Sequence, residues 1–286
     1  IDGSVRARAR REALERITEG GPLLVMTTPE TLAVDDVSEA LEKTGVGLAA
    51  VDEAHCISEW GHDFRPAYRR LGKRLRSLGG PPILALTATA TPRVREDILR
   101  QLQLRDPRVL VGSFDRPNLT YRIRSRENRR AQILEEVRRH AGEAMIIYAL
   151  SRRDTEQIAE ALQKDGVPAA FYHAGLSRPE RNHVHERFAR EQLDVVVATV
   201  AFGMGIDRSN VRAVIHASMP RSIEHYQQET GRAGRDGDPA ECVLLHSYAD
   251  VERWRSLAER SFNEAMSVTD DPESLRAGFE SQEGLL

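Results

Sequence analysis

Short, almost wholly apolar runs alternate with charged amphipathic segments along most of this chain, and this alternation constrains the fold more than any other feature. Val195–Thr199 and Val211–His216 are typical of the apolar runs. Strands that are buried on both faces of a parallel sheet read in this way. The segments between them repeat apolar residues at helical spacing, so we predict an α/β protein with mostly parallel sheets. The predicted strands are Leu23–Thr28, Leu48–Asp52, Ile83–Thr87, Val109–Gly112, Ala144–Ala149, Ala169–His173, Val195–Thr199, Val211–His216 and Cys242–His246. The predicted helices are Val5–Ile17, Pro66–Leu78, Arg93–Leu102, Arg129–His140, Thr155–Gln163, Pro179–Arg190 and Ile223–Thr230, the Pro179–Arg190 helix preceded by a capping box of Ser177 with Glu180.

A connector divides the predicted elements into two lobes. Strand–helix units lie on both sides of Ser113–Asn118, and Pro117 suits a linking segment. The 286 residues fit two domains of moderate size. We therefore expect a first lobe over 1–118, a second over 119–250, and a tail over 251–286. The tail is predicted to begin as a helix, Val251–Ala265, and to end in a flexible acidic stretch.

Composition excludes several classes of protein. The net charge of −3 does not by itself indicate a nucleic-acid-binding protein, which would need a local track of basic residues. Two cysteines, Cys56 and Cys242, cannot form a four-cysteine zinc site, and we expect both to be buried thiols in a reducing compartment. No apolar run of about 18 residues predicts a membrane span. The start at Ile1, without a signal peptide, indicates a chain that begins partway through a longer cytoplasmic protein.

Two adjacent carboxylates, Asp52 and Glu53, end the apolar run Leu48–Val51. The carboxyl ends of parallel strands are where such sheets bind ligands. In nucleotide hydrolases a strand-end Asp holds Mg²⁺ through water, and a neighbouring Glu orients and deprotonates the attacking water. A polar strand end without function is the competing interpretation.

Aromatic residues gather directly after these carboxylates, in a chain that is only 5% aromatic. Flat side chains such as Trp60 and Phe64 can stack on unpaired bases, and Arg65 can reach a phosphate. The alternative is a small hydrophobic cluster beneath a loop. Hydroxyl residues Thr87 and Thr89 follow a later strand and suit hydrogen bonding beside a nucleotide, although Thr after a strand is usually a helix cap.

The segments Ala198–Asp207 and Gln228–Gly237 give the strongest signal. Arg232 and Arg235 lie three residues apart in a glycine-flanked turn, where one can act as an arginine finger that stabilises transition-state charge. A surface turn with solvated arginines is the competing interpretation.

Together these segments, in this order, resemble the RecQ family of superfamily 2 DNA helicases. The run from Val51 to Pro66 resembles that family's motif II with its aromatic-rich loop, and Gln228–Gly237 resembles motif VI. The resemblance covers about residues 20–250. The remaining similar segments are Thr28–Glu30 (motif Ib), Thr87–Ala90 (motif III), Ser113–Asn118 (the lobe connector), Ile147–Arg152 (motif IV), Tyr172–Leu176 (a family signature) and Ala198–Asp207 (motif V).

The resemblance implies two RecA-like lobes that use ATP and Mg²⁺ to move 3′→5′ along DNA and unwind it, acting on single strands and duplex junctions in repair and recombination. Such a protein is expected at the bacterial nucleoid, or in the nucleus of a eukaryote. By residue, it implies that Asp52 holds Mg²⁺ through water, that Glu53 is the catalytic base, and that Arg235 is the arginine finger. It implies nucleotide-site support from His55, Thr87, Thr89, Gly205, Asp207, Gln228 and Arg232, and DNA binding by Trp60, His62, Phe64, Arg65, Thr199, Phe202 and Gly203.

The sequence departs from the family in one way that affects mechanism. No G-x-x-x-x-G-K-[ST] occurs in it, so the phosphate cradle and its lysine are absent, as are the upstream adenine-reading motif and the zinc module. We therefore expect little ATPase or unwinding activity from these 286 residues alone, and an unstable first lobe with exposed sheet edges. A non-catalytic nucleic-acid-binding remnant is the alternative function, and an RNA helicase is a third, which the aromatic loop argues against.

Some residues outside the motifs also have predicted places. His173 and His216 are expected to pack or hydrogen bond, Trp254 to pack on the second lobe, and Met204 to lie in the core. The run Arg6–Arg11 is expected to be a solvated face. A second basic stretch is hypothesised to track a nucleic-acid backbone, formed by Arg122, Arg124, Arg126, Arg129 and Arg130.

Overall fold

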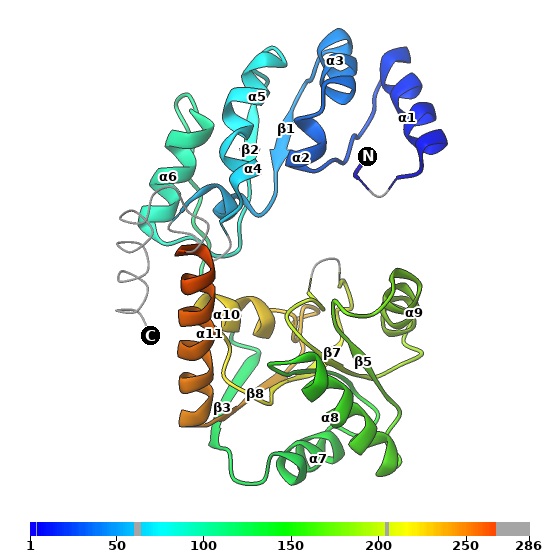
Figure 1. The fold of residues 1–286 in the computed structure, drawn as a ribbon, viewed down its shortest axis with the longest axis vertical. Helices are drawn as coiled ribbons and strands as arrows, with labels where there is room; N and C mark the ends of the chain where they lie inside the picture. Colours follow the sequence, from blue (N-terminus) through cyan, green and yellow to red (C-terminus); the bar gives the residue numbers. More distant parts are fainter. Residues whose placement is uncertain (4, 60–63, 204–205, 267–286) are drawn as a thin grey trace. The chain divides into compact units, whose positions relative to one another are not determined.

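The computed structural model describes residues 1–3, 5–59, 64–203 and 206–266, and divides the chain into a first unit, Ile1–Gly112, and a second that begins at Ser113. The division falls at the start of the predicted connector. Both units are α/β with parallel strands, as predicted (Figure 1). No helix within the described ranges is long and apolar enough to cross a membrane.

The first unit has a small sheet and a helical cover. Its described residues contain the parallel pair β1 (Ala49–Val51) and β2 (Ile83–Ala85), which pair in register from Ala49 with Ile83. A buried apolar cluster joins β1 to the helices, with Val37, Ile57, Leu75 and Ile98 among its members. The helical elements are α1 (Ala7–Glu19), α2 (Pro29–Leu32), α3 (Asp35–Thr44), the 3₁₀ helix η1 (Ala54–Ile57), α4 (Pro66–Arg69), α5 (Leu71–Ser77) and α6 (Pro92–Leu102).

Two strands predicted in the first unit do not form there, and this corrects the prediction. Leu23–Thr28 and Val109–Gly112 have no regular secondary structure and pair with no strand among the described residues. Their apolar side chains are exposed, Leu24 at 90% and Leu110 at 80%. A strand needs a neighbour to satisfy its backbone groups, and the two-strand sheet gives these segments none. The helix predicted over Pro66–Leu78 is also interrupted, at Arg70, where ψ is −10°.

The second unit is a parallel sheet of six strands, counted over the described residues, in the order β3-β8-β7-β4-β6-β5. Alternate residues of the central strands enter two different cores. Ile147, Val197 and Ile215 pack beneath α7 and α8, whereas Ile146, Val196 and Val214 pack on the other face with Phe188 of α9. The strands are β3 (Leu119–Ser125), β4 (Ala144–Tyr148), β5 (Ala169–Tyr172), β6 (Val195–Ala198), β7 (Val211–His216) and β8 (Ala240–His246). The helices are α7 (Arg129–Arg139), α8 (Arg152–Lys164), α9 (Arg178–Ala189), α10 (Ile223–Thr230) and α11 (Tyr248–Met266).

Several details of the second unit confirm the sequence analysis. Ser177 and Glu180 form the predicted capping box at the start of α9. The Trp254 indole on α11 donates to the carbonyl of Met219 at 2.9 Å, so the tail helix packs on this unit as expected. Cys242 here and Cys56 in the first unit are buried thiols, as predicted. The prediction for Met204 lies outside the described residues.

Candidate functional site

The predicted catalytic carboxylates stand at the carboxyl end of β1. Asp52 follows Val51 directly, and its carboxylate accepts a hydrogen bond from the Glu53 amide at 2.9 Å. Glu53 has a left-handed backbone, with φ 49° and ψ 42°. Non-glycine residues rarely adopt this conformation, and such strain gathers at functional sites. The turn at Glu53 starts η1 immediately, which keeps the exposed Asp52 and the half-buried Glu53 at the strand end.

His55 joins this strand end to the one after β2. Its buried imidazole Nδ1 lies 2.9 Å from the Thr87 hydroxyl and 3.3 Å from a carboxylate oxygen of Glu53. The Thr87 hydroxyl donates its single proton to the carbonyl of Thr89, so His55 Nδ1 is the donor in its bond to Thr87. The structure thereby brings together Glu53, His55 and Thr87. Backbone bonds from Leu86 to Val51 and from Ala54 to Leu86 fix the same two strand ends.

Thr89 is buried beside this cluster. Its amide donates to the Thr87 hydroxyl at 3.3 Å, and its own hydroxyl is a buried atom without a hydrogen-bond partner among the described residues. Thr91, two residues on, is the residue that caps α6, through a bond from the Val94 amide. The helix-cap interpretation of the threonine run therefore belongs to Thr91, and Thr87 belongs to the His55 cluster.

The aromatic loop is described only in part. Phe64 and Arg65 are both half-buried, and the Arg65 amide donates to the carbonyl of Cys56 at 2.9 Å, which ties the end of the loop to η1. Arg65 also precedes α4 as its N-cap residue. The predictions for Trp60 and His62 lie outside the described residues.

In the second unit, the predicted arginines lie in the turn after α10, and they differ in burial. Arg232 is 8% exposed and donates to the carbonyl of Gly203. Arg235 is exposed; its guanidinium donates to the carbonyl of Ile206 at 2.7 Å and lies 3.4 Å from the Asp207 carboxylate. Both arginines therefore hold the segment predicted as motif V. Gln228 is half-buried on α10, and Gly205 lies outside the described residues.

Gly203 is the point of closest approach in this arrangement. A Cβ atom added at Gly203 would lie 2.6 Å from a guanidinium nitrogen of Arg232. Thr199 begins the same loop, where its half-buried side chain follows β6 and its carbonyl accepts from the Phe202 amide at 3.0 Å.

Phe202 corrects a prediction of direct DNA contact. Its ring is only 1% exposed and packs against Tyr172 and Phe188, with centroid distances of 4.7 and 5.6 Å. Its carbonyl accepts a bond at 2.9 Å from the hydroxyl of Tyr148, whose pKa is raised by burial. A ring in this position supports the loop from below and offers no face to a base.

The turn that bears Arg232 and Arg235 is also held by residues that sequence reasoning treated only as a connector. Arg116 donates to the carbonyls of Ala233 and Gly234, at 3.1 and 2.7 Å. The Asn118 amide donates to Gly234 and to Asp238, both at 2.9 Å. The polar residues Arg116 and Asn118 on either side of Pro117 were the available signal. Nothing in the sequence spacing links position 116 with position 234.

Arg208 is a second structural residue that sequence reasoning missed. It is 6% exposed, and its guanidinium donates to the carbonyls of Phe188 and Leu193 and to the Asp194 carboxylate, at 2.9–3.1 Å. It also lies over the Phe188 ring at 4.8 Å. A buried cation with this many acceptors anchors the loop after Asp207 to the end of α9.

Two histidines have the roles expected for them. His173 Nε2 lies 3.0 Å from Glu156, and its ring stacks on Phe171. His216 Nε2 lies 2.8 Å from the buried carboxylate of Glu229, one residue after Gln228. Both contacts are hydrogen bonds of packed residues at strand ends, as predicted.

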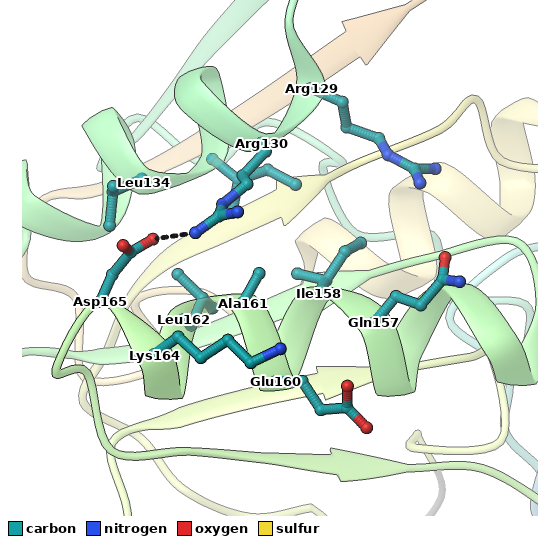
Figure 2. Close-up of a pocket in the computed structure, with 11 residues that line it drawn as sticks. Arg129, Arg130, Leu134, Gln157, Ile158, Glu160, Ala161, Leu162, Lys164 and Asp165 are labelled. Carbon is teal, nitrogen blue, oxygen red and sulfur yellow. Dashed lines mark hydrogen bonds and ion pairs between the residues drawn. The ribbon is translucent and has the colours of Figure 1, made fainter.

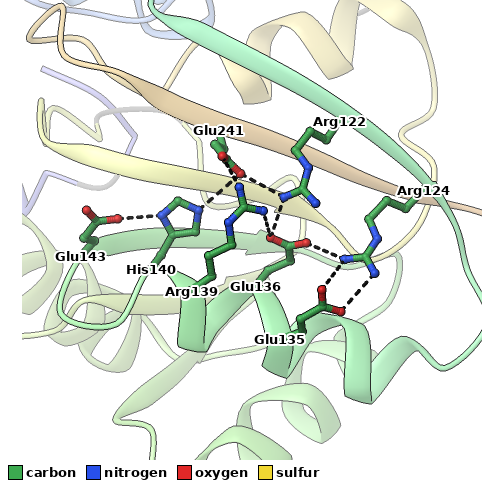
Figure 3. A network of polar contacts seen from close by, with 8 residues as sticks. All are labelled: Arg122, Arg124, Glu135, Glu136, Arg139, His140, Glu143 and Glu241. Atoms are coloured by element: carbon green, nitrogen blue, oxygen red, sulfur yellow. Dashed lines mark hydrogen bonds and ion pairs between the residues drawn. The ribbon is translucent and has the colours of Figure 1, made fainter.

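The predicted basic track on β3 and α7 is corrected by the structure, because all five arginines are paired with carboxylates. Arg122 and Arg124 donate to Glu136, which is fully buried, at 3.2 and 2.7 Å (Figure 3). Charges neutralised in this way leave little to release counterions from a nucleic-acid backbone. The remaining pairs are Arg126 with Asp250, Arg129 with Asp154, and Arg130 with Asp165.

Within the same network, Glu136, His140 and Glu241 place their ligand atoms within 4.8 Å of one another, a spacing that a metal could use. Arg139 donates to Glu241, and Arg122 donates to both carboxylates (Figure 3). Arginine cations thus occupy the oxygens that a metal would need, and the cluster is an ion-pair network.

A cavity of about 350 Å³ lies between α7 and α8. Apolar residues that line it include Ile133 and Ile158. Charged residues that line it include Lys164 and the pair Arg130–Asp165 (Figure 2). None of the residues predicted from the helicase motifs lines it, although Arg129 and Arg130 of the hypothesised basic track do.

Comparison with known proteins bears directly on these motifs. Residues 2–98 match the family model "DEAD/DEAH box helicase", and residues 128–237 match "Helicase conserved C-terminal domain". The ATP-dependent DNA helicases RecQ of Pasteurella multocida and Bacillus subtilis are 46% and 45% identical over 84% and 91% of this chain. The chain spans 38% and 44% of those relatives.

Among solved structures, Mycobacterium smegmatis helicase Lhr bound to ssDNA and AMP-PNP matches 98% of this chain and 41% of its own, with a TM-score of 0.66 at 22% identity. At that identity the likeness concerns the fold, and it agrees with helicase lobes of RecA type. With both helicase models matched in order, and with relatives of this similarity over most of its length, the chain belongs to the RecQ family of superfamily 2.

Proposed function

We propose that this chain supplies motor residues of an ATP-dependent DNA helicase, which couples ATP hydrolysis to 3′→5′ movement and strand separation. One observation carries the proposal: the carboxylates of Asp52 and Glu53 are held at the end of β1 by a left-handed turn and by the His55–Thr87 bond. This is the place and the chemistry that metal-assisted phosphoryl transfer needs.

In this function, Asp52 holds Mg²⁺ through water. Its exposed carboxylate at the strand end is a hard oxygen donor, which suits a Mg²⁺ ion that keeps most of its own water. A Mg²⁺ ion held there would supply neutralisation of charge on the phosphates. Glu53 orients and deprotonates the attacking water, and His55 fixes the Glu53 carboxylate from 3.3 Å while it donates to Thr87.

The second unit supplies the cations. Arg235 is the arginine that stabilises the transition state, because its guanidinium is exposed and can contact a phosphate. Its contact with the Asp207 carboxylate is long, at 3.4 Å, so a phosphate can replace that carboxylate. Arg232, in contrast, is buried and supports the nucleotide site indirectly, by donating a hydrogen bond to the Gly203 carbonyl. Gln228 supports the site from α10.

Single-stranded DNA and duplex junctions are the proposed partners. The proposed location is the compartment that holds the chromosome, and the proposed process is DNA repair or recombination. The relatives' names specify DNA helicases, and the Lhr structure was solved with ssDNA. Phe64 and Arg65, with Trp60 and His62, are the proposed DNA-sensing residues after motif II. Thr199 and Gly203 are the proposed contacts in the second unit.

These 286 residues alone are expected to hydrolyse ATP slowly, since the sequence has no G-x-x-x-x-G-K-[ST] to hold the phosphates. The second candidate function is a nucleic-acid-binding remnant without catalysis. An in-frame phosphate-cradle motif in the coding DNA upstream of Ile1 would decide for the enzyme, and a start codon just before Ile1 for the remnant.

The test of activity uses ssDNA-stimulated ATP turnover. We expect no stimulated turnover from the 286-residue chain, and turnover from a chain that includes the upstream motif. In the latter, Glu53→Gln lowers kcat by about 10²–10⁴-fold, the usual contribution of a general base. Turnover that survives Glu53→Gln, or a chain with the cradle that never responds to DNA, overturns the proposal. Competition with RNA strands of the same sequence separates a DNA motor from an RNA motor.

A further inference from the structure

The connector residues Arg116 and Asn118 both donate hydrogen bonds to one short stretch of main chain, the turn over residues 233–238 that carries Arg235. Three of their four bonds to this turn end on the carbonyls of Ala233 and Gly234, and the fourth on Asp238. Gly234 O accepts from both side chains, at 2.7 and 2.9 Å. These carbonyls follow the C-terminus of α10, where a cation is also favoured by the helix dipole.

The two connector side chains fix each other. Arg116 Nε lies 3.4 Å from Asn118 Oδ1, so the Asn118 amide is oriented with both of its N–H donors toward the turn. The fit is close, because a Cβ atom at Gly234 would lie 2.5 Å from Asn118 Nδ2 and 2.7 Å from Asp238 O. Gly234 has φ 52°, so a glycine is favoured here both by the left-handed backbone and by the close approach of Asn118.

The opposite side of the turn is held by the start of β7. The amides of Gly234 and Arg235 donate to the carbonyls of Val211 and Ser209, at 2.9 and 3.1 Å. Arg212 pairs with Asp236, directly after Arg235. The Arg235 backbone is therefore bounded by β7 on one side and by the connector on the other, while its side chain stays exposed.

We propose that Arg116 and Asn118 are positioning residues, which fix the direction of the Arg235 guanidinium by clamping the 233–238 turn. The inference rests on the proposed function for the role of Arg235 in ATP hydrolysis, but the clamp itself is a statement about this unit. Positioning matters for such an arginine because stabilisation of transition-state charge falls away when the donor is displaced by about 1 Å. The same connector is the covalent link between the two units, so its side chains hold the turn at the point where the chain enters the second unit.

Two variants each remove two of the four bonds, and Asn118→Asp does so with little change in volume. Asn118→Asp keeps the shape and the oxygen that faces Arg116, but replaces both N–H donors with an oxygen opposite two carbonyls. Arg116→Ala removes the other pair of bonds, and Arg116→Lys restores the charge without the fork of donors. Asp115→Asn is the matched control, because Asp115 is an exposed carboxylate in the same connector.

The first measurement is hydrogen exchange in the 286-residue chain, followed in peptides that cover 231–239 and in peptides of β7 and β8. In Asn118→Asp and Arg116→Ala we expect the turn to exchange about tenfold faster or more while the buried strands keep their protection, as local opening predicts. Arginine side-chain NMR, with the Arg235 signal assigned by its loss in Arg235→Lys, should show that signal averaged in the same variants and intact in Asp115→Asn. Unchanged exchange and an unchanged Arg235 signal overturn the clamp; equal acceleration of turn and strands reduces it to global stability and also overturns it.

The second measurement separates the clamp from the function of Arg235. In a chain with the phosphate cradle, Arg116→Ala should lower kcat for ATP with KM nearly unchanged, and Arg116→Lys should recover part of the loss. If Arg235→Ala leaves kcat intact, the proposed role of Arg235 is wrong, and the clamp is judged on exchange and NMR alone. If Arg235→Ala abolishes turnover but both clamp variants leave kcat intact, the positioning inference is wrong and the proposed function stands.

Discussion

Gly203 is the residue at which backbone, buried charge and proposed function meet most tightly. Its carbonyl accepts from Arg232, and the space where a Cβ would lie is taken by the same guanidinium, at 2.6 Å. Arg232 is 8% exposed, so its guanidinium has little room to withdraw. The absence of a side chain at 203 is therefore a condition for the buried arginine.

We predict that Gly203→Ala lowers the free energy of unfolding of the second unit by about 1–3 kcal/mol, the usual effect of overpacking. Urea unfolding followed by Trp254 fluorescence measures it. Gly112→Ala is the control, because a Cβ there meets open space. A loss no larger than that of the control would show that Arg232 shifts without cost.

At single positions, the sequence predicted the chemical role of a side chain better than it predicted whether that side chain is buried. Asp52, Glu53 and Arg235 could be chosen because few residue types perform those roles, and their neighbours in sequence supplied the motifs. Phe202 was assigned to DNA from the same motif, yet its ring fills the core beside Tyr172. Burial of one aromatic side chain depends on residues 30 positions away along the chain, and sequence spacing does not report it.

Between elements, Asp154 links the N-terminus of α8 to α7. Its carboxylate accepts from the Ser151 hydroxyl and from Arg129, both at 2.8 Å. Burial alone would raise the pKa of Asp154, but the bond from Ser151 and the Arg129 cation outweigh it, and the pKa is lowered. A carboxylate with a lowered folded-state pKa adds stability above the ordinary pKa of Asp, about 3.9. That stability is lost as the pH falls through the folded-state pKa.

We therefore predict that Asp154→Asn weakens the second unit near neutral pH and reduces its sensitivity to acid. Urea midpoints compared between about pH 6 and about pH 3 should fall further in the unsubstituted chain than in Asp154→Asn. Glu160→Gln, at an exposed position on the same helix, should leave the pH dependence unchanged. Parallel pH profiles for all three chains would exclude Asp154 as a source of acid sensitivity.

At the element scale, prediction succeeded for strands whose residues are almost all apolar, the edge strand β5 included, and it failed for β3, in which charged and apolar residues alternate. β4, β6 and β7 were found within a residue or two because their runs are wholly apolar. β3 was missed: its Tyr121 and Ile123 alternate with Arg122 and Arg124, and the arginines were taken as a nucleic-acid track. The period-2 alternation was the usable signal for an edge strand, and the glutamates of α7 that pair with those arginines lie too far along the chain to be assigned by spacing.

The whole molecule consists of two units with unequal cores. The second unit buries two apolar clusters, one on each face of its sheet. The first has one cluster and leaves apolar side chains exposed, Met26 at 76% and Leu48 at 59% among them. Since apolar burial is the main favourable term in folding, the first unit should be the less stable.

We predict that the chain unfolds in two steps in urea, the first unit at the lower concentration. Hydrogen exchange resolved by peptide, at increasing urea, should show residues 83–102 losing protection before residues 195–216. Ile98→Ala and Ile146→Ala are the matched pair, since each removes a buried isoleucine from one unit. Each should cost about 2–5 kcal/mol, and each should move only the transition of its own unit. A single transition that both substitutions shift equally would mean that the two units stabilise each other, because only coupled units unfold as one.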